Sequence, residues 1–146
     1  MDKGVNDADC LRLLQEHYLI VGDFDPNKIG EKTPIMLWMN QIWIDFRGDL
    51  RVHPSTSIGF GVKLLTTSHT FETGVGGKAI IRRVWIDNDC FVGSFSVLYN
   101  CWLQHHSVVA AGAVVRNITV PPYCIVEGNP ARVVKKFVDG KWIKCT

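Results

Sequence analysis

The sequence has no strong excess of charge, no long apolar run and no leader-like start. Its 146 residues carry 16 Lys and Arg against 14 Asp and Glu, a formal net charge of +2. This near balance does not favour nucleic acid or an anionic membrane as a partner. No apolar stretch approaches the roughly 20 residues of a membrane span, and the opening MDKGVNDADC lacks the layout of a signal peptide. We therefore expect a cytoplasmic protein without membrane insertion.

The five cysteines form no metal-binding or disulfide pattern. Their number is odd, they are widely spaced, and no C-x-x-C pair occurs. A zinc ribbon is therefore unsupported, a disulfide framework is not expected, and no metal is expected. We expect small buried side chains and one exposed thiol near the end of the chain. The cysteines are Cys10, Cys90, Cys101, Cys124 and Cys145.

The chain is long enough for one core, and its first part differs from the rest. Asp9 is a candidate cap for a short helix with Leu11, Leu14 and Tyr18 at helical spacing, and a turn-rich stretch follows from residue 22 to 34. We interpret residues 1–41 as a helix-and-loop cap over the open end of a stack of strands.

From about residue 44, an aliphatic residue is followed four positions later by a small or medium one, and the pair recurs every six residues. A hexapeptide period is typical of a parallel β-helix, in which three units complete one coil. The rhythm breaks between Ser68 and Ile80, and it slips by one residue near Phe95–Val97, which a corner must absorb. Phe95 and Trp102 are bulky for the pattern and are expected outside. The pairs are Val52/Thr56, Ile58/Val62, Leu64/Ser68, Ile80/Val84, Ile86/Cys90, Val92/Ser96, Val97/Cys101, Leu103/Ser107, Val109/Ala113 and Val115/Thr119.

Four motifs in order carry a family resemblance: TTSH ending at His69, FVGS at 91–94, VVAAGAVV at 108–115 and VPPYCIVEGNPAR at 120–132. With them the sequence resembles the hexapeptide-repeat acyltransferases, in particular the maltose, galactoside and capsule or exopolysaccharide O-acetyltransferases, over roughly residues 42–137. The resemblance implies an all-β fold: a left-handed parallel β-helix over 42–128 and a short coenzyme A-side segment over 129–146. It also implies acetyl-coenzyme A as co-substrate and a homotrimer with active sites between subunits.

His69 is the candidate general base. It stands where the repeat gives way to an active-site loop, residues 70–79, and an imidazole suits proton transfer near neutral pH. By resemblance it matches the catalytic base of the family. Ser94 matches a position near the reacting carbonyl, where it would be an oxyanion donor, with a corner serine as the equal alternative.

The resemblance also implies a coenzyme A surface. Phe91 stands where many relatives have a tryptophan that lines the pantetheine channel, and it lacks the indole N–H. Gly93 follows it, and Ala111 and Gly112 offer a small surface to the pantetheine arm. The resemblance implies that the phosphates are bound by Arg116, Arg132 and Lys135. Arg116 and Lys135 depart from the residues common at these positions in the family. Arg132 and Lys135 could instead belong to a solvated basic C-terminal segment.

The acceptor side is marked by the stretch IDFRGD, residues 44–49, which resembles a segment of the polysaccharide-directed relatives. Asp45 and Arg47 either bind sugar hydroxyls or pair with each other in a turn. The leading hypothesis is transfer of an acetyl group to a hydroxyl of a sugar or sugar-linked acceptor by direct attack on the thioester.

Two other functions remain open from the sequence. The first is a non-catalytic β-helix scaffold. The second is a zinc enzyme similar to the γ-type carbonic anhydrases, which need three histidine ligands gathered across a subunit interface. His69 and His105 fit two of them, but Ala110 or Ala111 stands where the third is expected, and His105-His106 occupy a corner.

Overall fold

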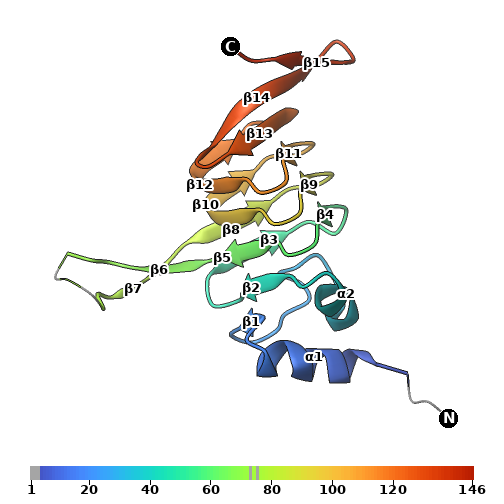
Figure 1. Ribbon diagram of the computed structural model, residues 1–146, viewed down its shortest axis with the longest axis vertical. Helices are drawn as coiled ribbons and strands as arrows, with labels where there is room; N and C mark the ends of the chain where they lie inside the picture. Colours follow the sequence, from blue (N-terminus) through green and yellow to red (C-terminus); the bar gives the residue numbers. More distant parts are fainter. Residues whose placement is uncertain (1–3, 73, 75) are drawn as a thin grey trace.

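The computed structural model describes residues 4–72, 74 and 76–146 (Figure 1). Its strands stack into a column with two short helices at one end and an antiparallel hairpin at the other. Most neighbouring strands are parallel and belong to successive turns of the chain, so the chain winds as the predicted parallel β-helix. Within the described ranges, no helix has the length and apolar character needed to cross a bilayer.

The predicted N-terminal helix is present as α1 (Asp7–Glu16), but its cap is not Asp9. Asn6 begins the helix, because its side-chain oxygen accepts a hydrogen bond from the Asp9 backbone N–H at 3.0 Å. Tyr18, expected on the same helix, lies beyond its end with φ +56° and is 77% exposed.

A second helix, α2 (Pro34–Met39), was not predicted, although Thr33 caps it and Pro34 occupies its first turn. The residues between the helices include β1 (Ile20–Val21). Leu14, Ile29 and Leu37 are fully buried in the same apolar cluster as the coils. This segment therefore covers the N-terminal end of the column, which would otherwise expose the core.

The coils form three faces, which we call A, B and C, and three corners named by the faces they join. Strands β10 and β12 each bend across the A–B corner and serve two faces. Face A contains β1, β2 (Trp43–Asp45), β5 (Lys63–Leu65) and the first halves of β10 (Val97–Leu103) and β12 (Val114–Val120). Face B contains β3 (Asp49–Val52), β8 (Arg83–Ile86) and the second halves of β10 and β12. Face C contains β4 (Ser57–Ile58), β9 (Phe91–Val92), β11 (Val108–Val109), β13 (Cys124–Gly128), β14 (Ala131–Val138) and β15 (Lys141–Lys144).

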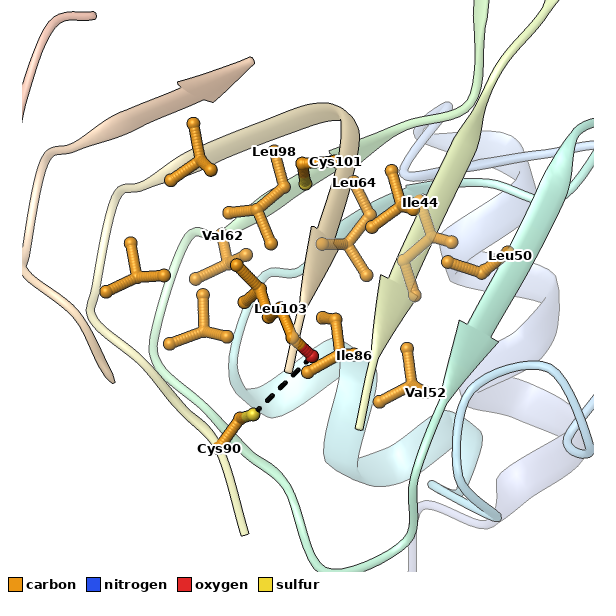
Figure 2. Packing of buried hydrophobic residues seen from close by; sticks show 14 of the residues in the cluster. Ile44, Leu50, Val52, Val62, Leu64, Ile86, Cys90, Leu98, Cys101 and Leu103 are labelled. Atoms are coloured by element: carbon orange, nitrogen blue, oxygen red, sulfur yellow. Dashed lines mark hydrogen bonds between the residues drawn. The ribbon is translucent and has the colours of Figure 1, made fainter. Parts of the chain in front are cut away.

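Inward side chains from all three faces form one continuous core (Figure 2). Leu64, Leu98 and Leu103 are fully buried in it. The cysteine prediction is confirmed for the four cysteines that are buried, whereas Cys145, expected to be exposed, is half-buried. Burial raises the pKa of Cys101 to about 12, so this thiol packs as a small apolar side chain.

The predicted one-residue slip exists, but it lies at Asn100 rather than near Phe95–Val97. Leu98 and Cys101 both point inward with only two residues between them, whereas Val97 is half-exposed. The next coil repeats the shortening at Asn117, so stacked coils are 17 residues apart, as the pairing of Leu98 with Val115 shows. Phe95 and Trp102 lie outside the core, as predicted.

The repeat breaks at a hairpin that leaves the column at the A–B corner and projects away from it (Figure 1). It consists of β6 (Thr67–His69) and β7 (Ala79–Ile81), paired antiparallel. Two predicted repeat pairs, Leu64/Ser68 and Ile80/Val84, are therefore wrong, because Ser68 and Ile80 pair with each other outside the coils. The loop was predicted over 70–79, and Thr73 and Val75 lie outside the described residues.

Candidate functional site

His69 is the last residue of β6, at the base of the projecting hairpin, and its side chain is exposed. It pairs with Ala79 across the hairpin. Because side chains alternate along a strand, His69 and Thr67 point to the same side of β6. Thr67 in turn contacts a charged cluster on the coil below, so this alternation links the candidate base to that cluster.

The cluster contains Asp45 and Arg47 on the A–B corner of the first coil. Arg47 donates two hydrogen bonds to the Asp45 carboxylate, from Nε at 2.9 Å and from Nη2 at 3.0 Å. Arg47 Nη2 also donates to the Thr67 hydroxyl at 2.9 Å, and that hydroxyl donates to the second Asp45 oxygen. Of the two predicted possibilities, the structure shows the pairing of Asp45 with Arg47; an acceptor contact stays a prediction.

Asp45 is charged and buried, while Arg47 reaches solvent. The Asp45 side chain is 1% exposed and that of Arg47 is 52% exposed. Burial alone would raise the pKa of Asp45, but the hydrogen bonds from Arg47 and Thr67 outweigh it and hold the pKa below its usual range. Asp45 therefore holds the Arg47 guanidinium in place, and Arg47 is the member of the pair that a ligand can reach.

Sequence reasoning missed the two threonines that complete this corner. The Thr66 hydroxyl donates to the Asp45 carbonyl at 2.8 Å and accepts from the Gly48 N–H at 2.9 Å. Thr66 is fully buried. The signal was present in the TTSH motif, but only its histidine was interpreted.

Ser94 lies on a different edge of the column, at the C–A corner. A Cβ added at Gly59 would lie 2.8 Å from Ser94 Oγ, so the serine side chain packs directly over a glycine of the preceding coil. The Ser94 carbonyl accepts a hydrogen bond from the Gly112 N–H at 2.9 Å. This is the geometry of a corner serine, and an oxyanion role stays a prediction.

The predicted coenzyme A residues gather on face C and on the same C–A corner. Phe91 is 51% exposed, and the ladder of face C aligns it with Val108, Ile125 and Lys135 in successive strands. An aromatic side chain and a cation thus stand at opposite ends of one outward column. Arg132 is exposed on β14 opposite Glu127.

Small residues make the C–A corner accessible. Ala111 and Gly112 are exposed, and nothing lies within 4 Å of a Cβ added at Gly112. Gly93 is buried instead, because a Cβ there would lie 2.5 Å from the Ala111 nitrogen. Arg116 is exposed on the part of face A that follows this corner.

Within one chain, the structure therefore does not bring all the predicted residues together. His69, Asp45 and Arg47 share the A–B corner, whereas Ser94, Phe91 and the small residues share the C–A corner and face C, with face A between the two groups. Cavities of about 300 and 420 Å³ lie beside the B–C corner, and His69 lines neither.

The histidines of the alternative zinc site are also apart in one chain. His105 lies at the B–C corner, where its Nδ1 is 3.0 Å from His106 Nδ1 and its ring packs edge-on against Tyr123. His106 Nε2 is 3.6 Å from an Asp89 oxygen. Among the described residues, no group of three or more His, Cys, Asp or Glu side chains is arranged to hold a metal ion.

Comparison with solved structures shows the fold. The chain matches galactoside acetyltransferase in complex with coenzyme A with a TM-score of 0.57 at 24% identity, over 66% of this chain and 50% of the other. It matches a hexapeptide-repeat acetyltransferase of Vibrio cholerae O1 biovar eltor, complexed with acetyl-coenzyme A, with a TM-score of 0.52 at 26% identity over 68% of this chain and 52% of the other. These likenesses confirm the predicted left-handed β-helix.

Comparison of sequences points to another branch of the same fold. The chain is 28% identical to γ carbonic anhydrase 2, mitochondrial, of Arabidopsis thaliana over 139 residues, 82% of this chain and 46% of that protein. No protein-family model matches the chain. The chain spans about half the length of the curated relatives it matches.

Proposed function

Since this chain belongs to the hexapeptide-repeat superfamily, we propose that it transfers an acetyl group from acetyl-coenzyme A to a hydroxyl of a sugar or sugar-linked acceptor. The observation that carries the proposal is the position of His69, exposed at the base of a hairpin and on the same side of β6 as Thr67, which accepts a hydrogen bond from the Arg47 guanidinium. Solved structures with this fold include acetyltransferases in complex with acetyl-coenzyme A and coenzyme A.

The chemistry assigned to His69 is general base catalysis. Its imidazole takes the proton of the acceptor hydroxyl while that oxygen attacks the thioester carbonyl carbon. The tetrahedral intermediate collapses, the carbon–sulfur bond breaks, and the imidazolium returns the proton to the coenzyme A thiolate. Arg47, held by Asp45 and Thr67, presents an N–H fork to an acceptor oxygen beside the hairpin.

The C–A corner and face C are suited to acetyl-coenzyme A. The open surface at Ala111 and Gly112 lets an extended pantetheine arm approach the backbone. Phe91 supplies an apolar wall, and Lys135 and Arg132 supply cations for phosphates at the C-terminal end of face C. Ser94 stands in the same corner as a candidate donor to the thioester oxygen.

Because these two groups lie on different edges, we assign the complete site to two chains of a homotrimer. The hairpin of one subunit would bring His69 to the C–A corner of its neighbour. Large apolar side chains are exposed on this hairpin, with Phe71 at 69% and Ile81 at 56%, which favours a partner surface there.

The test is thiol release from acetyl-coenzyme A with a panel of sugars and nucleotide-sugars. His69→Ala is expected to lower acceptor-dependent release by about 10²-fold or more, because the hydroxyl loses its base. His17→Ala is the matched control, since His17 is an exposed histidine at the end of α1. Equal activity of the His69→Ala variant and the wild type would remove His69 from the mechanism.

The sequence relatives favour one second candidate, a carbonic anhydrase-like zinc enzyme. Its ligands would have to come from different chains, because His69 and His105 occupy different corners. CO₂ hydration measured on zinc-loaded protein, in parallel with thiol release, separates the two. Hydration lost in both His69→Ala and His105→Ala, without thiol release, would replace the acetyltransferase proposal; the reverse pattern supports it.

A further inference from the structure

A cavity of about 300 Å³ lies at the N-terminal end of the column, away from the residues of the proposed acetyl transfer. It is lined by the loop before α2, by α2 itself and by the start of β4. Its size is at the lower end of pockets that bind small molecules. The lining residues the argument uses are Glu31, Lys32, Met36, Leu37, Ile42 and Ile58.

Lys32 is the unusual member of this lining. The residue is only 8% exposed, yet its ammonium donates a single hydrogen bond, to the Thr56 carbonyl at 3.0 Å. In the described part of the chain, no carboxylate lies within 4 Å of it. Lysine carries three donors and is rarely buried without a partner of opposite charge. Burial lowers the pKa of Lys32, as expected for a cation without such a partner.

The surroundings of Lys32 define the kind of partner that would fit. Met36, Leu37, Ile42 and Ile58 supply apolar walls, and Leu37 and Ile42 are part of the buried core. Glu31 lies in the same lining, and its negative charge disfavours a dianion such as a phosphate monoester. A monoanion with a short apolar body satisfies both features.

We infer that this cavity is a binding site for a small organic carboxylate, with Lys32 as counter-ion and the apolar body of the ligand against α2 and β4. The carboxylate would accept hydrogen bonds from the Lys32 ammonium N–H groups that do not bind the Thr56 carbonyl. The apolar body of the ligand would bury the apolar side chains that line the cavity. The inference does not depend on acetyl transfer, since none of its residues belongs to the proposed catalytic groups.

The test uses hexanoate and benzoate as probes, with hexanol as the neutral analogue and hexyl phosphate as the dianion. We expect saturable NMR shifts and a rise in melting temperature with the carboxylates at concentrations up to about 10 mM, and at least tenfold weaker binding of the other two. Lys32→Met should lose carboxylate binding. Lys28→Met is the matched control, because the Lys28 ammonium donates to the Phe46 carbonyl at 3.2 Å outside the cavity.

A second variant tests the same cavity without touching the charge. Met36→Trp, at a residue that is 49% exposed on the rim, should fill the space and lose carboxylate binding while Lys32 remains. If Lys32→Met does not fold, Met36→Trp alone decides. Equal binding of hexanol and hexanoate, carboxylate binding retained in both variants, or no saturable binding to the wild type would each overturn the inference.

Discussion

At the scale of single residues, one buried carboxylate organises the A–B corner. Asp45 receives hydrogen bonds from Arg47 and Thr67, and its own carbonyl accepts one from Thr66. The sequence showed the charged pair but left its role open, because a short IDFRGD stretch does not reveal which side chain is buried. Asp45 is identified as the buried member of the pair by its hydrogen bonds with Thr66 and Thr67, which lie about 20 positions away in the chain.

Arg47→Ala should destabilise the fold by about 2 kcal/mol, because it leaves the buried Asp45 charge without its main donor. The loss should be full at neutral pH. A carboxyl whose pKa is lowered on folding stabilises the native state above its unfolded pKa, about 4, and that stabilisation is lost as pH falls through the folded value. Urea unfolding of wild type and variant between neutral and acidic pH measures this difference.

Arg12→Ala provides the control for that series. Arg12 forms an exposed pair with Glu16 one helical turn away, with side chains 60% and 53% exposed, so its removal should change stability little at any pH. A gap between Arg47→Ala and wild type that does not shrink on acidification would show that Asp45 is not the partner that matters.

At the scale of elements, the corners rather than the strands set the repeat. Backbone positions with positive φ recur every 17 residues at the B–C corner, in Asp89, His106 and Tyr123, each between +56° and +57°. The A–B corner does the same with Asn100 and Asn117. Asparagine tolerates this conformation well, whereas β-branched residues do not.

Asn100 is the position where this requirement can be measured. Its φ is +44°, and its side-chain nitrogen donates to the Asn117 side chain at 2.9 Å. Asn100→Val should cost about 2 kcal/mol because valine is strained there, while Asn100→Gly loses only an exposed hydrogen bond, about 0.5 kcal/mol. Urea unfolding with an unchanged m-value compares the two.

The ordering of the two variants is the decisive result. Equal destabilisation by valine and glycine would mean that the side-chain bond to Asn117, and not the backbone conformation, holds the corner. A larger loss in Asn100→Gly would contradict the argument from φ altogether.

These corners also explain what could be predicted about the elements. The inward pairs from Ile86 to Ser96 follow a strict period of six and were found, because each strand there occupies one face. The slip was placed about four residues too early because Val97 and Leu98 are both aliphatic, and only the backbone at Asn100 tells which one points inward. Helix α2 was not predicted because it has only six residues, too few to show a helical period, and it directly follows a turn-rich stretch.

At the scale of the whole molecule, the predicted site residues divide into two surfaces. Sequence reasoning placed His69 with Ser94 because the family resemblance brings both to one reaction. The sequence did not show that face A separates His69 from Ser94 within a chain, because the separation depends on the corner of the coil at which each hexapeptide lies. The hydrogen bonds of Asp45 and Arg47 with Thr67 on the hairpin could not be predicted either, because they form only when the coils stack.

Mixing two inactive variants tests whether two chains share a site. His69→Ala removes the base, and Ala111→Trp should block the open C–A corner. Refolding a 1:1 mixture should restore about a quarter of the wild-type sites in a cyclic trimer, because one interface in four combines an intact half from each chain. Thiol release measures the restored fraction.

The control for mixing is the double variant. His69→Ala refolded with the chain carrying both His69→Ala and Ala111→Trp should stay inactive, since no interface then has a base. Absence of restoration in the first mixture, with both proteins folded, would place the whole reaction within one chain and overturn the two-chain site.

The hairpin of β6 and β7 leaves the column and returns to it at one corner. The Arg82 N–H donates to the Thr66 carbonyl at 2.6 Å, which joins the two ends across the departure point. The coils above and below therefore stack as if the segment were absent, and β10 pairs directly with both β5 and β8. The hairpin beyond His69 can therefore change in length or sequence while the coils keep their stacking, provided that Thr67 keeps its hydrogen bonds with Asp45 and Arg47 at the base.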